Sequence, residues 1–376
     1  MHKTFLNIIS PVFSPESFDI KKENEIEEIF KTAISLNLLM LLYGQLKKVC
    51  QLQEAKKSVE IMDRYRNAYF SIIARSIKQE VLENKIISIL QHHHILSLVF
   101  KGNALARDVY QKPNSRSSSD IDILIKSKNI LSANKILQQE GYIAQEAESL
   151  EFWETRKHHA VYQCPETNIL IEIHWNFCIP GFFNLTSDDI WQNVNIDNKG
   201  NASLSPEMIL IQLFIHNSMH AFREFRIFVD ILWAMHRYGA IINWIDFTKT
   251  LKKTGLLKTA YISINQIIKT WENQIEKIDS IRVLFAEIKK QMLLKPLFLS
   301  GYFNYDLAKK ITYNHKRDQF FVRLTLDGSR LILRSFVKSF FPSINGIKTF
   351  YNDYRTWVLP FNYIRFMGWR ISEWIK

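Results

Sequence analysis

Apolar residues recur at helical spacing through the N-terminal part of the chain. From about residue 18 to residue 91 they follow one another at intervals of three and four, which predicts amphipathic helices that pack as one layer. The spacing is clearest in two runs: Ile26, Ile29, Phe30, Ala33, Ile34 and Leu38, and then Ile61, Tyr65, Tyr69, Ile72, Ile73 and Ile77. Residues 1–17 precede this pattern, and we expect them to form a loosely structured lead-in.

The pattern changes to that of strands between residues 95 and 178. An apolar run at 95–100 predicts a buried strand, and the next residues, Lys101-Gly102-Asn103-Ala104, predict a turn that opens a short helix. After a polar loop, Asp120-Ile121-Asp122-Ile123-Leu124-Ile125 alternates with period two and predicts a second strand. This part of the chain is therefore expected to be the α/β core.

A helix and a hairpin complete the predicted core. Residues 129–140 have helical spacing that stops at Gly141, a residue that favours the left-handed end of a helix. The runs 158–164 and 168–175 flank Pro165-Glu166-Thr167-Asn168, whose composition is that of a tight turn. We expect the two runs to pair as a β-hairpin.

Helical spacing returns after residue 204. Ser205-Pro206-Glu207 is a strong start signal, since it combines a capping residue, a proline at the first helical position and an acid in the first turn. Further helices are expected at 222–238, 243–253, 256–271 and 279–292. The whole pattern predicts four regions: an N-terminal helical region at 1–94, the α/β core at 95–200, a helical domain at 201–305 and a basic aromatic region at 306–376.

The composition is that of a folded protein with large cores. Of the 376 residues, 47% are hydrophobic and 13% aromatic, which excludes a largely disordered chain. The three cysteines, Cys50, Cys164 and Cys178, form no C-x-x-C pair and do not indicate a disulfide framework. No apolar run approaches the ~20 residues of a membrane-spanning helix, and the first residues lack the apolar core of a secretion signal. We therefore expect a cytoplasmic protein.

The formal net charge of +12 is concentrated near the C-terminus. From Lys309 to Lys376, thirteen Lys or Arg accompany four Asp or Glu, and many Phe, Tyr and Trp are interleaved with them. The default interpretation is that this segment covers the helical domain. Peripheral contact with the inner, anionic face of a membrane is the alternative. Nucleic acid is not expected as a partner, because only the charge of this segment favours RNA tailing.

Two aspartates stand out on the alternating strand. Asp120 and Asp122 share one face, roughly 7 Å apart along the backbone, while the isoleucines enter the core. Carboxylates placed in this way can converge on two metal ions about 3.5–4 Å apart, the arrangement used for in-line phosphoryl transfer. Glu172 is a third acid that faces away from neighbouring isoleucines on a later strand. The turn at Gly102 points backbone N–H groups outward, which suits a triphosphate.

These motifs resemble the nucleotidyltransferases of the DNA polymerase beta superfamily. The fit is closer to a bacterial branch of uncharacterised nucleotidyltransferases with a K-G-x-A-L turn, an R-x-x-D-I-D strand and a later acid-x-H-W. Here the motifs read Lys101-Gly102-Asn103-Ala104-Leu105, Arg116-Ser117-Ser118-Ser119-Asp120-Ile121-Asp122, with one residue more between Arg and Asp, and Glu172-Ile173-His174-Trp175. The wider superfamily has Gly or Ser where this chain has Asn103.

The resemblance implies an α/β (α+β) fold, a polymerase-beta-like core with a mixed sheet flanked by N-terminal and C-terminal helical regions. It implies transfer of NMP from an NTP to a hydroxyl or phosphate of an unknown acceptor (a small molecule, peptide or glycan precursor), with release of pyrophosphate. Asp120, Asp122 and Glu172 would be catalytic and would hold two Mg²⁺ ions, with Mn²⁺ as an alternative. The nucleotide would be bound by Lys101, Gly102, Asn103, Arg116, Ser119 and His174.

Some roles stay open. A chain of this fold can also be a catalytically inactive nucleotide-binding accessory or scaffold protein at a membrane surface. His174 suits either phosphate contact or a core position, and His158-His159 are expected to face opposite sides of a strand in structural roles. His216 and His220, four apart on one helix, would join Asp230 either in a buried polar cluster between helices, which we favour, or in the lining of an acceptor pocket.

Overall fold

The computed structural model describes most of the chain. The described residues are 2–17, 23–53, 56–145, 157–198, 200–272, 274–292, 322–340, 344, 347–348, 351 and 355–375. Much of the basic aromatic region, including residues 306–321, lies outside the described residues, so its expected role as a cover or a membrane contact stays a prediction. None of the helices described is both long enough and apolar enough to cross a bilayer.

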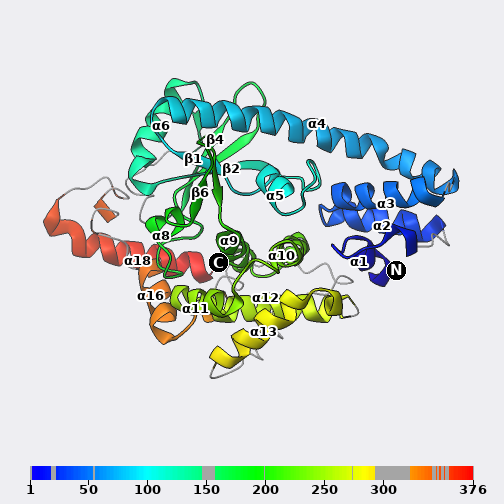
Figure 1. Cartoon of the computed structure of the whole chain (residues 1–376). Coiled ribbons are helices and arrows are strands. Elements are labelled where there is room, and N and C mark those ends of the chain that lie inside the picture. The colour runs from blue at the N-terminus through cyan, green and yellow to red at the C-terminus, as the bar shows by residue number, and fades with distance from the viewer. Residues whose placement is uncertain are drawn as a thin grey trace.

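A five-stranded mixed sheet lies at the centre of the fold (Figure 1). Its strands are β1 (Ser97–Val99), β2 (Asp120–Ile125), β3 (Ile143–Ala144), β4 (His159–Gln163) and β5 (Leu170–His174), in the spatial order β1-β2-β5-β4-β3. β2 and β5 pair in parallel, whereas the other neighbours are antiparallel. The predicted hairpin of β4 and β5 is confirmed, as is the predicted α/β class with a mixed sheet flanked by helices.

The two faces of this sheet have different roles. Ile121, Ile123 and Ile125 point to the face covered by α4 (Lys56–His92) and α6 (Ile130–Gln139), where a separate apolar core forms. α6 is followed by Gly141, whose φ of 88° is the predicted left-handed conformation after the helix end. Asp120, Asp122 and Leu124 alternate onto the opposite face, and there Leu124 joins the main core. The alternation therefore leaves the two carboxylates on the face that looks towards the C-terminal helices.

The N-terminal segment differs from its expected loose form. It begins with helix α1 (His2–Ile8), followed by the short helix η1 (Pro15–Ser17), and Phe5, Ile8 and Ile9 are fully buried. Two distant tryptophans hold it in place. The Nε1 atom of Trp271 donates to the carbonyl of Leu6 (3.1 Å), and that of Trp233 donates to the carbonyl of Ile9 (2.9 Å). The prediction was wrong because these partners lie more than two hundred residues away in the sequence.

Three helices form the predicted N-terminal layer: α2 (Glu23–Ser35), α3 (Leu39–Gln53) and α4. α4 has 37 residues and is therefore about 55 Å long. It packs against α2 and α3 at one end and against the sheet at the other, so it joins the two parts of the molecule (Figure 1). Aromatic stacking holds the layer together, with Phe30 on Tyr65 and Tyr43 on Tyr69.

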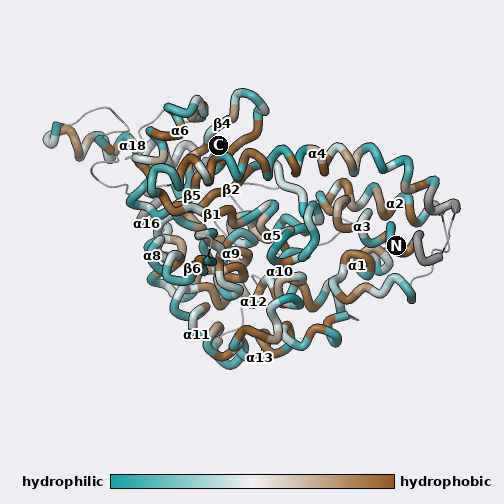
Figure 2. The backbone as a smooth tube through the Cα atoms, turned by 45° about the horizontal axis from the view of Figure 1, so that its top comes forward, coloured by the Kyte–Doolittle hydropathy of each residue, from teal (hydrophilic) through white to brown (hydrophobic). Residues whose placement is uncertain are grey.

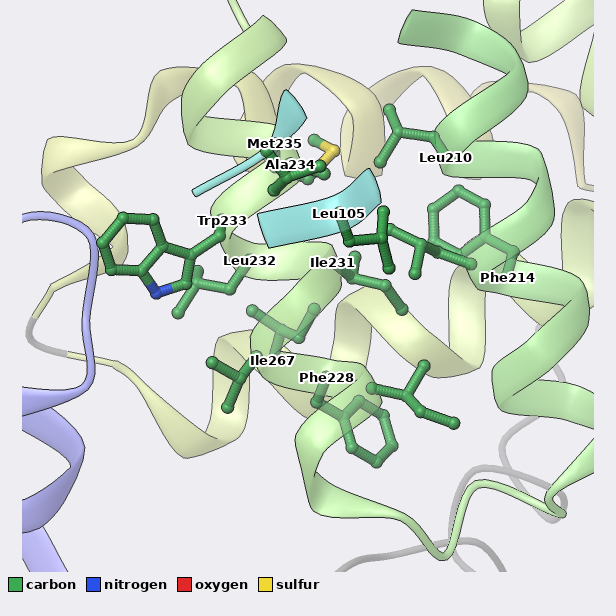
Figure 3. Packing of buried hydrophobic residues seen from close by; sticks show 14 of the residues in the cluster. Leu105, Leu210, Phe214, Phe228, Ile231, Leu232, Trp233, Ala234, Met235 and Ile267 are labelled. Carbon is green, nitrogen blue, oxygen red and sulfur yellow. The ribbon is translucent and has the colours of Figure 1, made fainter. Parts of the chain in front are cut away.

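The helices after residue 204 form the other half of the main core. Ser205 caps α9 through a hydrogen bond from the Met208 amide to its Oγ, as its start signal predicts. In Figure 3, Leu210 and Phe214 of α9 lie on the side of α10 that carries Ile231, within one apolar cluster. The elements of this half are α9 (Pro206–Met219), α10 (Phe225–Tyr238), α11 (Trp244–Thr254), α12 (Leu257–Thr270), η3 (Ile275–Lys277) and α13 (Asp279–Gln291).

The remaining elements are short or lie near the C-terminus. Along the backbone, apolar segments gather inside while polar segments follow the outer surface (Figure 2). These elements are α5 (Asn103–Asp108), η2 (Ser127–Asn129), α8 (Ser187–Trp191), the pair β6 (Val194–Ile196) and β7 (Ala202–Leu204), α16 (Ser329–Phe340), η4 (Thr356–Val358) and α18 (Leu359–Ile375). Asp327 ties the described part of the C-terminal region to α12 by accepting from the amides of Leu257 and Lys258.

Candidate active site

The turn after β1 requires glycine. Gly102 has φ 52° and ψ −119°, a combination that side-chain-bearing residues rarely adopt, and it immediately precedes α5. A Cβ atom on Gly102 would also lie 3.2 Å from Cβ of Ser118, in the loop before β2. The turn and this loop therefore pack closely together. Lys101 precedes the glycine and directs its side chain to β2, where its Nζ atom lies 2.6 Å from Oδ1 of Asp122.

Asn103 faces away from this turn. Its side chain is buried against α4, where it accepts a hydrogen bond from Ser76 Oγ (2.8 Å) and donates to Glu83 Oε1 (3.0 Å). The side chain is thus committed to joining α5 to α4, and it does not line the cavity described below. The expected nucleotide contact from the Asn103 side chain does not fit this geometry, which indicates a structural role instead.

Glu83 offers a test of this buried network. Burial raises its pKa to about 7, despite the opposing charge of Arg107 and the hydrogen bond from Asn103. The folded protein then keeps a proton that the unfolded chain releases above pH 4.5, so this group's contribution to stability is lost as pH rises towards 7. We expect Glu83→Gln to raise the free energy of unfolding above pH 7 by up to about 3 kcal/mol and to change it little below pH 4.5.

Urea titrations of wild type and variant across this pH range measure the effect. Glu60→Gln is the matched control, because Glu60 is exposed on the same helix and its charge is not among those that shift the pKa of Glu83. A stability difference between Glu83→Gln and wild type that does not grow with pH would contradict a raised pKa at Glu83.

A polar cavity of about 350 Å³ lies between the acidic face of the sheet and the helices α9 and α10. Its lining includes seven of the nine residues predicted from the sequence as site residues: Lys101, Arg116, Ser119, Asp120, Asp122, Glu172 and His174. The structure adds residues that the sequence did not mark for this site, among them Ser118, Gln212, Glu224 and Arg226. The segments that line the cavity therefore come from both sides of the molecule.

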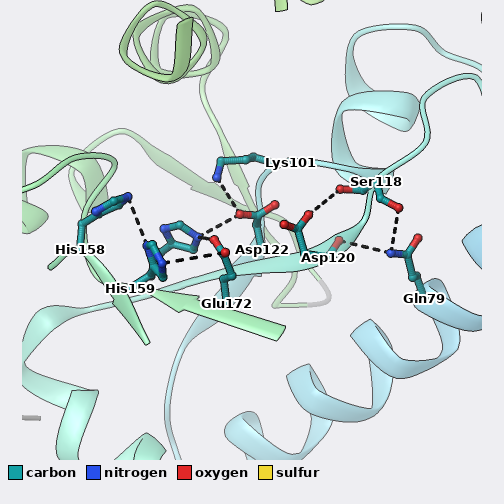
Figure 4. A network of polar contacts seen from close by, with 9 residues as sticks. Gln79, Lys101, Ser118, Asp120, Asp122, His158, His159 and Glu172 are labelled. Atoms are coloured by element: carbon teal, nitrogen blue, oxygen red, sulfur yellow. Dashed lines mark hydrogen bonds and ion pairs between the residues drawn. The ribbon is translucent and has the colours of Figure 1, made fainter. Parts of the chain in front are cut away.

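The parallel pairing of β2 and β5 brings two acids side by side. Asp122 and Glu172 are direct register partners, although fifty residues separate them in the sequence. Figure 4 shows the polar network around Asp122 and Glu172. In this network, Nε2 of His174 lies 2.9 Å from Oδ1 of Asp122 and 3.0 Å from Oε2 of Glu172. Asp120 lies two residues before Asp122, and its Oδ1 accepts from the hydroxyl of Ser118 (2.9 Å).

The carboxyl groups differ in their electrostatics. Burial opposes ionisation of Asp122, but the Lys101 ammonium and the hydrogen bond with His174 hold its pKa well below the usual range. Burial also opposes ionisation of Glu172, but its hydrogen bond with His174 outweighs this effect, so the pKa of Glu172 is lowered. At Asp120, burial and the negative charges of Asp122 and Glu172 raise the pKa. A divalent cation would relieve this repulsion, because opposite charge favours the ionised carboxylate.

Histidines surround these acids. His158 and His159 both line the cavity, contrary to the expectation that they face opposite sides, because β4 begins at His159 and strand alternation does not extend to His158. Their rings contact each other, with His159 Nδ1 3.3 Å from His158 Nε2. His216 and His220 line the cavity from α9 and its C-terminal cap. His220 Nδ1 lies 2.6 Å from Oε1 of Glu224.

Asp230 is separate from those two histidines and pairs with Arg116. The Arg116 Nε atom donates to both carboxylate oxygens of Asp230 at 3.0 Å, and the hydroxyl of Tyr110 donates to Oδ1 at 2.6 Å. The expected cluster of His216, His220 and Asp230 is therefore divided between the cavity and this ion pair. Arg116 Nη1 is buried and has no hydrogen-bond partner within the described part of the chain. The ion pair with Asp230 thus fixes the position of Arg116, which lines the cavity.

The loop before β2 is held by residues that the sequence gave no reason to select. Gln79 of α4 donates to the carbonyls of Ser118 and Asp120, both at 3.3 Å (Figure 4). Arg75, also on α4, donates to the carbonyl of Ser119 (2.7 Å), and Arg226 of α10 donates to that of Ser117 (2.9 Å). These four bonds position the loop from both sides. No local sequence pattern shows that a helix residue contacts a loop some forty positions away.

Two groups of side chains could hold a metal ion among the described residues. One combines Asp122, Glu172 and His174, and the other combines His158, His159 and His174; in each group, the possible ligand atoms lie within 4.8 Å of one another. The first group contains the hard oxygen ligands that Mg²⁺ prefers. Neutral imidazoles, by contrast, suit transition metals.

Comparison with known proteins agrees with this geometry. A family model described as "Uncharacterised nucleotidyltransferase" matches residues 22–269, about two thirds of the chain. The match spans the helices α2 to α4, the sheet and the helices from α9 into α12. No curated protein and no solved structure gives a match.

Proposed function

The chain belongs to the uncharacterised nucleotidyltransferase family, and we propose that it transfers NMP from an NTP to a hydroxyl of an acceptor with release of pyrophosphate. Membership of this family makes the chain a transferase. The acceptor and the roles of individual residues are part of the proposal. The observation that carries it is the juxtaposition of Asp122 and Glu172 on paired parallel strands, with Asp120 beside them in one cavity. A phosphate can be the acceptor group in place of a hydroxyl.

The carboxylates are assigned to divalent metal ions. Asp120, Asp122 and Glu172 would hold two Mg²⁺ ions, for which Mn²⁺ is an alternative, because Asp122 and Glu172 supply ionised oxygen ligands in one place and Asp120 lines the same cavity. When bound, such ions neutralise phosphate charge and make the acceptor hydroxyl easier to ionise. His174 positions Asp122 and Glu172 by contacting one oxygen of each.

Basic residues on the same cavity are assigned to the phosphates. Lys101 and Arg116 reach it from the Gly102 turn and from the loop before β2. Both can stabilise the negative charge that develops on the phosphate oxygens in the transition state. Ser119 and the backbone of Gly102 lie next to them. His216 and His220, on the side of the cavity formed by α9, would face the acceptor.

Nucleotide binding is the first test of the proposal. In calorimetric titrations with each of the four NTPs, we expect one NTP to bind in the presence of Mg²⁺ and this binding to be lost in EDTA. Pyrophosphate release with a panel of hydroxyl-bearing acceptors then tests turnover. Binding without pyrophosphate release under every condition would favour the nucleotide-binding accessory role, and no binding of any NTP would reject both functions.

A further inference from the structure

A second cavity lies where the N-terminal helices meet α10. Its volume is about 460 Å³, within the range of about 300–1,000 Å³ that is usual for small-molecule sites. Its walls come from the segment that leads from α1 into η1, from α3, from the residues that follow α5 and from α10. Among the described residues, none lines both this cavity and the one at the acidic face of the sheet. The two cavities are therefore separate sites.

Positive charge gathers on the walls of the second cavity. Lys48 of α3, Lys112 after α5 and Arg237 of α10 line it, and its described lining contains no Asp or Glu. None of these three cations forms an ion pair with a residue that the structure describes. Glu16, which the charge of Lys48 reaches, is exposed and does not line the cavity. The cavity therefore offers three positive charges to an anion.

Lys48 and Lys112 bring two ammonium groups close together. Burial, followed by the charge of Lys48 and a hydrogen bond between the two side chains, lowers the pKa of Lys112 to about 8. An ammonium group only donates hydrogen bonds, so two of them cannot satisfy each other. An anion between them would accept from both and would relieve their repulsion.

Apolar side chains form another part of the walls. The Trp233 ring has its centre 5.8 Å from the Lys112 Nζ atom. Its Nε1 atom donates to the carbonyl of Ile9, which fixes the ring next to the N-terminal segment. Phe13 and Pro11 of that segment line the cavity and are partly exposed. An inorganic anion has no use for such a surface, whereas the organic part of a ligand gains free energy by covering it.

We propose that the second cavity is a binding site for a small organic phosphate. The phosphate lies between Lys48, Lys112 and Arg237, and the organic group packs against Phe13 and Trp233. A phosphate monoester carries a charge of about −1.5 to −2 at pH 7 and three acceptor oxygens, which match three cations better than the single charge of a carboxylate. This binding requires neither a metal ion nor turnover, so the inference does not rest on the proposed function.

Phenyl phosphate is a suitable probe, because it joins a phosphate monoester to a planar apolar group. The full-length chain is titrated by calorimetry at neutral pH in EDTA, so that metal-dependent binding at the carboxylates does not contribute. We expect saturable binding that weakens about tenfold or more in Lys48→Gln and in Lys112→Gln, since each variant loses a charge-assisted hydrogen bond. Benzoate and inorganic phosphate should both bind more weakly, because each lacks one of the two groups that the cavity recognises.

Two control variants locate the bound anion. Lys47→Gln removes the same charge next to Lys48 on α3, but Lys47 is exposed and does not line the cavity, so its affinity should equal that of wild type. Lys101→Gln alters the other cavity and should also bind as wild type does. The thermal midpoint shows that each variant is folded.

Three results would overturn the proposal. The first is no saturable binding of phenyl phosphate. The second is binding that Lys101→Gln removes while Lys48→Gln and Lys112→Gln retain it, which would place the anion in the other cavity. The third is equal affinity for phenyl phosphate and for benzoate or inorganic phosphate, which would reject an organic phosphate as the ligand.

Discussion

Asp122→Asn should leave the protein folded and reduce NMP transfer by about a thousandfold or more, the scale of loss when a main electrostatic contributor to the transition state is removed. Asp122 is the centre of the polar network, because both Lys101 and His174 contact its Oδ1 atom. Asparagine has the same shape and keeps an oxygen that can accept these contacts, but it lacks the charge that a divalent ion requires. Pyrophosphate release under saturating NTP and metal is the measurement.

The control for this prediction is the same substitution at an exposed site. Asp188 lies in the first turn of α8 and does not line the cavity, so Asp188→Asn should keep wild-type activity. Circular dichroism and the thermal midpoint show whether each variant is folded. Activity of a folded Asp122→Asn within tenfold of wild type would exclude Asp122 from the catalytic group.

Metal-dependent NTP binding gives a second readout. We expect the Asp122→Asn variant to lose the difference between titrations with Mg²⁺ and with EDTA. A retained difference would place the metal elsewhere in the cavity, even if turnover fell.

Local sequence patterns predicted the elements that carry the acids. Period-two alternation in β2 decided which face Asp120 and Asp122 occupy, because a strand with isoleucine at every second position has only one stable orientation against a core. The hairpin was equally predictable. The turn at 165–168 contains Asn168, which tolerates the positive φ of 57° that the structure gives it.

The arrangement of these elements could not be predicted from the residues alone. Nothing local shows that β5 pairs with β2 in parallel, although that pairing brings Glu172 beside Asp122. The resemblance to a nucleotidyltransferase family implied that Glu172 joins Asp120 and Asp122 in one site, but it did not specify this pairing. Similarly, distant tryptophans hold the segment of α1 through the carbonyls of Leu6 and Ile9, and periodicity over a seven-residue helix is too short to reveal this.

Residues with two plausible partners were the least predictable. Asn103 follows the turn glycine, a position suited to a phosphate contact, yet α4 offers its amide a buried hydroxyl and carboxyl. The resemblance to a nucleotidyltransferase family assigned Arg116 to the nucleotide. The structure shows that its Nε atom is committed to Asp230, 114 residues later, while its Nη1 atom has no hydrogen-bond partner among the residues that the structure describes.

This ion pair leads to the second large effect, which concerns stability. Asp230→Ala should lower the free energy of unfolding by about 3–5 kcal/mol, because it leaves the Arg116 guanidinium buried without a counter-charge. Arg116 is 3% exposed and Asp230 is fully buried, so water cannot replace the carboxylate. The Tyr110 hydroxyl would lose its acceptor as well. Urea denaturation followed by tryptophan fluorescence measures the loss.

Tyr110→Phe tests the hydrogen bond to Asp230 while the negative charge of Asp230 is retained. It removes only the hydroxyl that donates to Asp230, and a hydrogen bond to a charged group contributes about 1.5–3 kcal/mol. We therefore expect a smaller loss than for Asp230→Ala, with the packing of the ring against Trp233 retained. If Asp230→Ala were no less stable than Tyr110→Phe, the pair with Arg116 would add nothing to stability. Arg116 would then be held at the cavity by the other contacts of its loop, and Asp230 would have no part in positioning it for phosphate.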